Sequence, residues 1–311
     1  MAKTPAIAQK NDGVAKVAKR TNVRVYNTIA AGPRTAAAKL EFVARIPGRH
    51  FLRNLIERRA LVAQLVSRDF RARYVGSSAG WLWGVVHPIV QLLIWIMVFQ
   101  YWFGATLGPD EVTTNYPLFL FCGILPWWLF QETVTRSAGS LVEQSNLITR
   151  TVFPSEVVPV SIFLSSMIHH LIAVLLAILT VALWLKTFSP MIVLLPVYML
   201  FVGLFAVGVG WIASSLHVYL RDTAQALGVI INLWFWITPI MISEDRIKGP
   251  LHALVRWNPM SWLVNAYRHR LLSNQWPDWR ELVVIAAYSI SVFVLGGLFF
   301  RHLKRGFADV L

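Results

Sequence analysis

Residues Val157–Leu185 read VVPVSIFLSSMIHHLIAVLLAILTVALWL, a stretch without a single Asp, Glu, Lys or Arg. A helix needs about 20 apolar residues to cross the hydrocarbon core of a bilayer. Five further stretches approach or meet that requirement, and we expect each of them to span a membrane. They are Trp81–Phe103, Tyr116–Ala138, Met191–Leu216, Thr223–Ser243 and Leu282–Phe300. The sequence therefore predicts an all-α integral membrane protein with six transmembrane helices.

The composition agrees with this interpretation. Of the 311 residues, 56% are apolar and 14% are charged, whereas a soluble domain carries about 25% charged residues. The single cysteine, Cys122, excludes a disulfide framework within the chain and a cysteine-rich metal site. We expect no metal site, no cofactor bound by this chain and no nucleic-acid partner.

The charge distribution predicts the orientation. Residues 1–80 carry 16 Lys and Arg against 4 Asp and Glu, a net charge of +12, whereas residues 81–311 carry only +2. Basic segments adjoining spans stay in the cytoplasm, and Arg301, Lys304 and Arg305 follow the last span. We therefore expect a multi-pass protein of the cytoplasmic (inner) membrane with both termini in the cytoplasm. Residues 246–280 conflict with this orientation. They should lie on the exterior side of the membrane, yet they carry an excess of positive charge.

Three regions precede and include the spans. Residues 1–48 are basic and without clear periodicity, and we expect a disordered tail that could rest on anionic lipid. Residues 49–75 are expected to form an amphipathic helix in the cytoplasmic membrane interface, or one packed on other protein. Its apolar face repeats every three or four residues: Leu52, Leu55, Ile56, Val62, Val66 and Phe70. Residues 76–311 would form the six-span domain.

Several different short motifs follow one another along the chain. Gly76, Gly80 and Gly84 are four apart, which predicts a bare helix face that another backbone could approach. The remaining fragments follow in sequence order: Arg73–Trp83 and Pro88, Gly123–Trp127, Asn146–Pro154 and Pro159, Arg221-Asp222, Trp236 and Pro239, Asn258-Pro259, Tyr267-Arg268, and the terminal Phe307–Leu311.

In this order and spacing, residues 50–311 resemble the membrane subunit of type-2 ABC exporters, in the branch that exports O-antigen, capsule or teichoic acid. The resemblance implies a homodimer bound to two copies of a separate ATPase, which would hold ATP and Mg. It implies a lipid-linked polysaccharide as substrate and no bond chemistry in this chain. The sequence itself lacks G-x-x-x-x-G-K-[ST], the loop that cradles phosphates.

The resemblance also assigns roles to loops. Residues 133–154 would include a coupling helix that docks on the ATPase, although an ordinary loop is the alternative. The residues expected to take part in coupling are Asn146, Leu147, Arg150, Phe153, Pro154, Arg221 and Asp222.

Residues 249–276 are too interrupted to span the membrane. Two short apolar faces meet at Asn258-Pro259, which indicates a turn between two half-helices re-entering from outside. A surface-lying hairpin is the alternative. In the family such a pair closes the channel toward the exterior, which would make an exterior gate of Trp257, Asn258, Pro259, Tyr267 and Arg268.

Tryptophans concentrate in and near three spans. Indole rings stack on the C–H faces of sugars, but they also suit the membrane interface and helix packing. Because the family's channels are lined by aromatics, five are candidates for the channel wall: Trp83, Trp95, Trp127, Trp128 and Trp236.

Other interpretations stay open. Glu132 and Arg136 are four apart on one helix face and are expected to form a structural ion pair, or else a gate on the sugar path. A type-2 exporter of a lipid or drug is an alternative function. A membrane-bound acyl- or glycosyltransferase is another, resting on a weak His217/Asp222 H-x4-D pattern.

Overall fold

The structure is a computed structural model, and it describes residues 58–311 apart from 74, 78–79, 109–110, 151–152 and 187–188. Every regular element in these ranges is a helix, with no strand among them. The all-helical fold predicted from the sequence is therefore confirmed. The expected tail and the first residues of the expected interfacial helix, up to position 57, lie outside the described residues.

Five helical segments are long and apolar enough to cross a membrane. They are α5 (Trp83–Ile96) continued by the π-helical η2 (Met97–Trp102), α6 (Tyr116–Glu143), α8 (Val157–Leu185), η3 (Pro190–Leu194) continued by α9 (Leu195–Tyr219), and α13 (Trp279–Leu303). Capping side chains define where two of them begin. Asn115 accepts a hydrogen bond from the Leu118 backbone at α6, and Asp278 accepts one from the Arg280 backbone at α13.

The predicted fifth span is shorter than expected. Helix α10 covers Thr223–Ile237, only 15 residues, which corresponds to about 22 Å of helix. It stops there because Pro239 disfavours helical backbone at the preceding residue, and Thr238 is extended with ψ 132°. The structure thus contains five long candidate spans and one short apolar helix, and the count of six spans stays a prediction.

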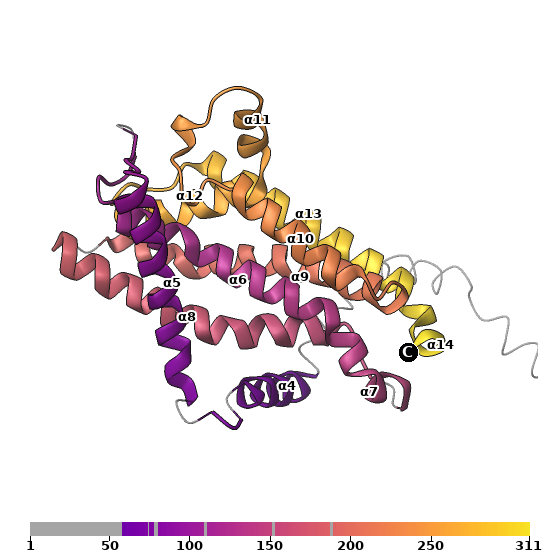
Figure 1. Cartoon of the computed structure of the whole chain (residues 1–311). Coiled ribbons are helices and arrows are strands. Elements are labelled where there is room, and N and C mark those ends of the chain that lie inside the picture. Colours follow the sequence, from indigo (N-terminus) through magenta and orange to yellow (C-terminus); the bar gives the residue numbers. More distant parts are fainter. Residues whose placement is uncertain (1–57, 74, 78–79, 109–110, 151–152, 187–188) are drawn as a thin grey trace, which may run out of the picture. The chain divides into compact units, whose positions relative to one another are not determined.

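Short helices mark two opposite ends of the bundle (Figure 1). We call one the α7 end: it carries α4 (Arg59–Ala72), α7 (Ser145–Arg150), η5 (Lys304–Gly306) and α14 (Phe307–Val310). Helix α4 packs against α8, and α14 packs against α7. We call the other the α12 end: it carries η4 (Glu244–Arg246), α11 (Pro250–Trp257) and α12 (Pro259–Leu272).

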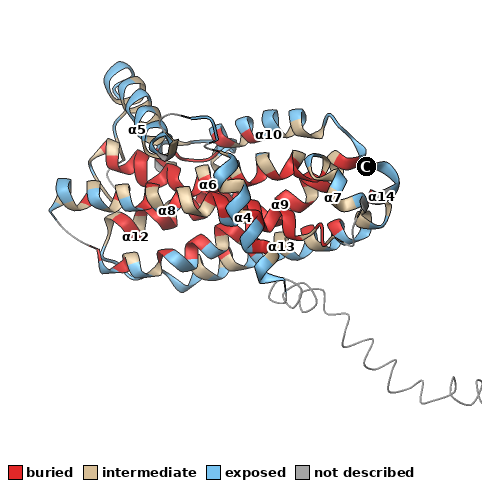
Figure 2. Cartoon of the chain, turned by 90° about the horizontal axis from the view of Figure 1, so that it is seen from below, coloured by how far each residue is buried: buried red, intermediate tan, exposed pale blue. Residues whose placement is uncertain are grey.

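The core lies along α6 and α9, which Figure 2 shows as the most buried helices. Helix α9 also packs closely on α13, because Gly208 and Gly296 face each other. A Cβ on Gly208 would lie 2.5 Å from the Val292 carbonyl oxygen, so a side chain cannot be accommodated there without a shift. Cys122 of α6 is fully buried in this core.

Helices α5 and α10 stand at the opposite extreme. Neither α5 nor η2 contains a buried residue, and α10 buries only Ile231 and Phe235. Figure 2 shows both helices largely exposed. Their apolar outer faces have no partner among the described residues.

The expected bare glycine face is wrong. Gly76 and Gly80 have φ of +79° and +50°, and no heavy atom lies within 4 Å of where their Cβ would be. They belong to the turn between α4 and α5, where a left-handed conformation favours glycine. The helical backbone begins only with η1 (Gly80–Leu82), which leads into α5.

Candidate functional site

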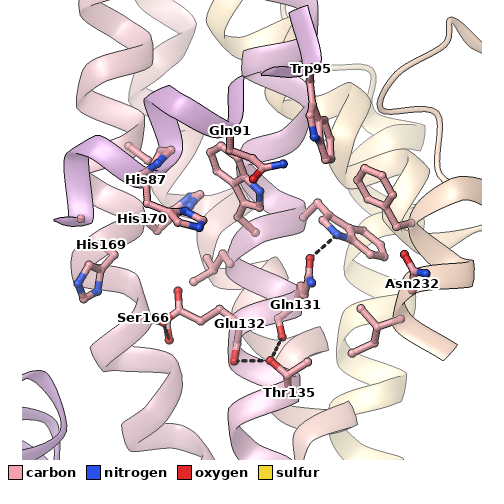
Figure 3. A pocket seen from close by; sticks show the side chains of 18 of the residues that line it. His87, Gln91, Trp95, Gln131, Glu132, Thr135, Ser166, His169, His170 and Asn232 are labelled. Carbon is pink, nitrogen blue, oxygen red and sulfur yellow. Dashed lines mark hydrogen bonds between the residues drawn. The ribbon is translucent and has the colours of Figure 1, made fainter. Parts of the chain in front are cut away.

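A cavity of about 580 Å³ lies between α5, α6, α8 and α10. Figure 3 shows its wall, to which α5 contributes His87, Gln91 and Trp95 and α6 contributes Gln131, Glu132 and Thr135. Helix α8 adds Ser166, His169 and His170, and α10 adds Asn232. Four helices that are far apart in the sequence therefore build one open, largely aromatic and polar chamber.

Four of the five candidate channel tryptophans line this cavity: Trp95, Trp127, Trp128 and Trp236. Three of them contact Phe235, whose ring centroid lies 5.0 Å from that of Trp95, 5.5 Å from that of Trp127 and 5.4 Å from that of Trp236. Trp127 is only 1% exposed and so forms the back of the wall, whereas Trp236 is 62% exposed. Trp83 is not among the lining residues and lies exposed at the start of α5.

Amide and hydroxyl groups share the wall with these rings. Trp127 Nε1 donates to Gln131 Oε1 at 2.8 Å, which fixes the orientation of the amide. Thr135 Oγ1 donates to the backbone carbonyl of Gln131 at 2.7 Å. Gln91 and Asn232 come from α5 and α10 on either side of the cavity (Figure 3). The chamber thus offers both hydrogen-bond donors and acceptors beside flat apolar rings.

A cluster of four charged side chains joins α4 to α6; we call Asp69, Arg73, Glu132 and Arg136 the charge cluster. Arg73 Nη1 donates to Glu132 Oε1, and Arg136 Nη2 donates to Asp69 Oδ1. Two longer ion pairs complete it, Arg73 to Asp69 at 3.6 Å and Arg136 to Glu132 at 3.8 Å. The expected Glu132–Arg136 pair is present, but the closest partner of each carboxylate lies across the two helices.

The charge cluster extends to α8 and the floor of the cavity. Arg73 Nη2 donates to Ser166 Oγ at 3.1 Å, and Ser166 Oγ donates to Glu132 Oε1 at 3.0 Å. Arg73 Nη1 also lies 3.0 Å from His169 Nδ1. Since Glu132, Ser166 and His169 all line the cavity, α4 is linked to the chamber through these contacts.

The cluster keeps Asp69 ionised. Burial on its own would raise the pKa of Asp69, because it disfavours the charged form. The hydrogen bond from Arg136 and the positive charges of Arg136 and Arg73 outweigh burial and hold the pKa below its ordinary value. The link between α4 and α6 is therefore a charged one at neutral pH.

The expected coupling residues lie at the α7 end. Asn146 and Leu147 belong to α7, and Arg150 is its last residue, with a side chain outside the described part of the structure. Phe153 follows and packs against a cluster of Val62, Leu65 and Val157. Phe153 therefore connects the segment after α7 to α4.

Other expected coupling residues surround this segment. Pro154 is buried just before α8, whereas Arg221 and Asp222 form the exposed turn between α9 and α10. A second groove of about 480 Å³ opens beside α7, between α4, α6 and α8, and Asn146, Leu147 and Arg68 contribute to its wall. The α7 end thus presents a polar groove next to the expected coupling helix.

The C-terminal residues support α7 from the other side. Lys304 pairs with Glu156, which precedes α8. Phe307 is buried, with its ring edge-on to that of Phe300 at 5.5 Å. Because α14 contacts α7, the C-terminal residues support the expected coupling helix, a contact that the sequence analysis did not predict.

Two short helices meet at Asn258, as predicted for the segment before the last span. Asn258 Oδ1 accepts a hydrogen bond from the Met260 backbone at 3.0 Å and one from Trp234 Nε1 at 2.8 Å. Its Nδ2 donates to Thr238 Oγ1 at 2.9 Å. Asn258 therefore caps α12 and ties the turn to the end of α10.

The residues of the expected gate have unequal environments. Trp257, the last residue of α11, is 74% exposed, and Pro259 opens α12. Tyr267 is fully buried, and its hydroxyl lies 3.1 Å from His170 Nε2. Most of α12 is buried, so this helix is not the surface-lying hairpin considered as an alternative.

Arg268 lies at the centre of the α12 end and is 2% exposed. Its Nε donates to the Phe119 carbonyl at 3.2 Å, Nη2 to the Ile240 carbonyl at 2.7 Å, and Nη1 to Asn265 Oδ1 at 3.1 Å. The guanidinium lies 3.5 Å from the centre of the Phe119 ring. Gly123 leaves the space for it, because a Cβ there would lie 2.6 Å from Arg268 Nε.

Arg270 is a second buried cation that the sequence analysis did not single out. It forms an ion pair with Glu281 at 3.9 Å and donates to the Gln275 carbonyl at 3.1 Å. Tyr198 donates to the same carboxylate at 2.9 Å. The sequence did contain a signal for it, namely the excess of positive charge in residues 246–280, to which Arg270 belongs. Arg268 and Arg270 lie inside the fold, so part of that excess is buried, whereas Arg246, Lys248, Arg256 and Arg280 are exposed.

A sequence profile of the ABC-2 type transporter family matches residues 60–272, well over half of the chain. The chain belongs to the ABC-2 type transporter family. The matched region of this ABC-2 protein contains α4, the cavity, the charge cluster and the pair α11–α12.

Named relatives cover most of this ABC-2 protein. The O-antigen export system permease protein of Myxococcus xanthus is 26% identical over 260 residues, 83% of this chain and 98% of that protein. A Klebsiella pneumoniae protein of the same name is 27% identical over 254 residues, 81% of this chain and 95% of its own. The polysialic acid transport protein of Escherichia coli is 22% identical over 245 residues, 77% and 92% of the two chains.

The transferase alternative gains no support from the geometry. His217 Nδ1 is buried and has no hydrogen-bond partner in the described structure, so this nitrogen does not bind Asp222. Asp222 is exposed in the turn after α9. Within the described ranges, no group of three His, Cys, Asp or Glu side chains gathers to hold a metal ion.

Proposed function

We propose that this chain is the membrane-spanning subunit of an ATP-driven exporter that moves a lipid-linked polysaccharide across the cytoplasmic membrane. The observation that carries the proposal is the cavity between α5, α6, α8 and α10, walled by indole rings and amides within an ABC-2 membrane domain. The names of the relatives, which refer to O-antigen export and to polysialic acid transport, support it.

The wall suits a sugar chain chemically. Pyranose rings present C–H faces that pack on aromatic rings and hydroxyl groups that both donate and accept hydrogen bonds. Trp128 and Trp236 supply rings at the cavity, while Gln91 and Asn232 supply amides on opposite sides. A purely apolar cavity would favour lipid tails, so the interleaved amides favour the glycan.

A homodimer would complete this chamber. Helices α5 and α10, which form two of its sides, expose apolar side chains including Leu93, Ile94, Val229, Ile230 and Leu233. A contiguous apolar face of this kind needs lipid or another protein surface. A second copy related by a two-fold axis would bring the two cavities together around one path.

The energy source would be a separate protein. The sequence lacks the phosphate-binding loop of P-loop ATPases, so two copies of an ATPase carrying ATP and Mg would bind at the α7 end. That assignment places the α7 end and both termini in the cytoplasm, with the α12 end outside. ATPase movement would then reach α4 and α7, and the charge cluster would pass it to α6 and the cavity.

The glycan role is tested with the chain purified together with its ATPase and reconstituted in lipid. Trp128→Ala combined with Trp236→Ala should abolish glycan-stimulated ATP hydrolysis and glycan export while the protein still accumulates in the membrane. Trp279→Ala is the matched control, because Trp279 is exposed on α13 outside the cavity. Normal export by the double variant would contradict the proposal.

Coupling is tested at the α7 end. Leu147→Ala together with Phe153→Ala should leave the chain inserted but separate ATP hydrolysis from export. Phe153→Ala alone distinguishes two roles, because Phe153 packs on the α4 cluster. If it impairs coupling while the ATPase still copurifies, it acts through α4; if the ATPase is lost, it belongs to the docking surface.

A further inference from the structure

We infer that the cavity selects an electrically neutral glycan and excludes a polyanionic one. The inference rests on the proposed function, since it names the substrate class of the same cavity. It separates this chain from a relative whose name refers to polysialic acid, a polymer with a carboxylate on every sugar. The inference follows from the charge of each residue that lines the cavity.

The described lining of the cavity contains one carboxylate, Glu132, and no Lys or Arg. This is notable in a chain with 29 Lys and Arg and a net charge of +14. The nearest cations are Arg73 and Arg136, and both are engaged in the charge cluster with Asp69 and Glu132. Two arginines and two carboxylates cancel, so the cluster offers no net positive charge to the chamber.

Two of the three lining histidines do not supply that charge either. His169 Nδ1 lies 3.0 Å from Arg73 Nη1, and a guanidinium can only donate, so this nitrogen accepts and its ring is neutral. His170 is 5% exposed, and its Nε2 pairs with the Tyr267 hydroxyl at 3.1 Å. His87 is exposed on α5 at the cavity wall and is the remaining imidazole among the described lining residues.

A polyanion would therefore lose hydration without gaining counter-charges. Removing ionised groups from water is costly unless opposite charges replace the water, and the described lining contains no Lys or Arg to replace it. A neutral glycan loses far less, because Gln91, Asn232 and Thr135 can replace the water on its hydroxyls. Figure 3 shows these polar groups on three different helices around the chamber. The wall that offers a polyanion no counter-charge can therefore bind uncharged sugars.

The test compares two probes on the chain reconstituted with its ATPase. One is a lipid-linked oligomannose, and the other is an oligosialic acid of matched length on the same lipid. ATP hydrolysis and vesicle uptake should respond to the neutral probe, with a response to the acidic probe about tenfold weaker. An equal or stronger response to the acidic probe would overturn this inference and leave the proposed function standing. No response to either probe would instead count against the proposed function itself.

Two variants locate the selectivity in the cavity. Asn232→Lys puts a cation on the wall and should raise the response to oligosialic acid relative to oligomannose. Gln225→Lys is the matched control, because Gln225 is exposed on the same helix outside the lining and should leave the ratio unchanged. Gln91→Lys repeats the test from α5, should Asn232→Lys fail to accumulate. If neither lining variant changes the ratio, the selection is made elsewhere and the inference is wrong.

Discussion

At the α7 end, four side chains that are 18–32% exposed join α4 to α6. At the α12 end, by contrast, the single side chain of Arg268, 2% exposed, joins α12 to two other segments through the Phe119 and Ile240 backbone carbonyls. Partly exposed ion pairs contribute about 0–1 kcal/mol each, and their partners can be exchanged at little cost. A buried guanidinium has no such freedom, because each carbonyl left without a donor costs about 1–3 kcal/mol. The contrast indicates an α7 end that can rearrange and an α12 end that stays fixed.

The largest effect is expected from Arg268→Ala. It would leave the Phe119 and Ile240 carbonyls unsatisfied and open a space beside Gly123. We expect loss of most folded protein, measured as the monodisperse fraction in detergent and its melting temperature. Arg256→Ala, on the exposed side of α11, is the control and should behave as wild type. A stable Arg268→Ala protein would show that Arg268 does not hold the α12 end fixed.

Gly123→Ala should disturb the same contacts of Arg268 but reduce stability by a smaller amount. The new Cβ would lie 2.6 Å from Arg268 Nε, so the guanidinium must shift away from its carbonyl partners. Overpacking of this kind costs about 1–3 kcal/mol, which should lower the melting temperature. Gly139→Ala on the same helix is the matched control, since its nearest neighbour is the flexible Glu143 carboxylate at 3.3 Å. Equal melting temperatures for the two variants would show that the fit around Arg268 is loose.

At the α7 end, Asp69→Asn should change function more than stability. Loss of the Asp69 carboxylate weakens the attachment of α4 to α6, and we expect the free energy of unfolding to change by no more than about 1 kcal/mol. Export per ATP hydrolysed should fall while the melting temperature hardly moves. Glu143→Gln, an exposed neutralisation on α6, serves as the control. A large loss of stability would mean that this end is as rigid as the other.

Acidification tests the same attachment without a mutation. Because the pKa of Asp69 is held below its ordinary value near 3.8, its ion pair is intact above that value and is lost as the pH falls through the lowered one. A nitroxide on Gln64, on the exposed face of α4, should become more mobile in that range. A nitroxide on Ala253 of α11 is the comparison at the other end, and an equal change at both sites would argue against a local release of α4.

The smallest effect is expected from Trp257→Ala. The side chain is 74% exposed, so its removal should leave the melting temperature unchanged within error. If Trp257 nevertheless belongs to an exterior gate, its loss would appear as ion conductance in reconstituted vesicles. Deletion of α12 is not a suitable gate test, because that helix carries Arg268 and Tyr267 in the core.

The apolar length of the spans allowed the long helices to be predicted from the sequence. The uncharged run Val157–Leu185 is α8 with the same bounds, and Asn258-Pro259 is the turn between α11 and α12. Both depend on local chemistry, the apolar length of a span and the capping of a helix by an asparagine side chain. Such features are fully encoded in neighbouring residues.

What could not be predicted depends on contacts between distant segments. The sequence analysis assigned Arg268 to an exterior gate, and only the positions of Phe119, Gly123 and Ile240 show why it is buried. Likewise, Glu132 has a partner four residues away in sequence, but its closest one, Arg73, lies on another helix. The prediction of a bare helix face from the glycines before α5 was wrong, because spacing alone does not distinguish a helix face from a turn.

The burial of Cys122 has a practical consequence. It is the only thiol in the sequence and is fully enclosed within α6 and its neighbours. A membrane-impermeant maleimide added to intact cells should therefore label only cysteines introduced on purpose, with no need to remove the native one first. A cysteine at Lys248 should react from outside and one at Arg221 only after the cells are opened, which would read the orientation of the chain directly.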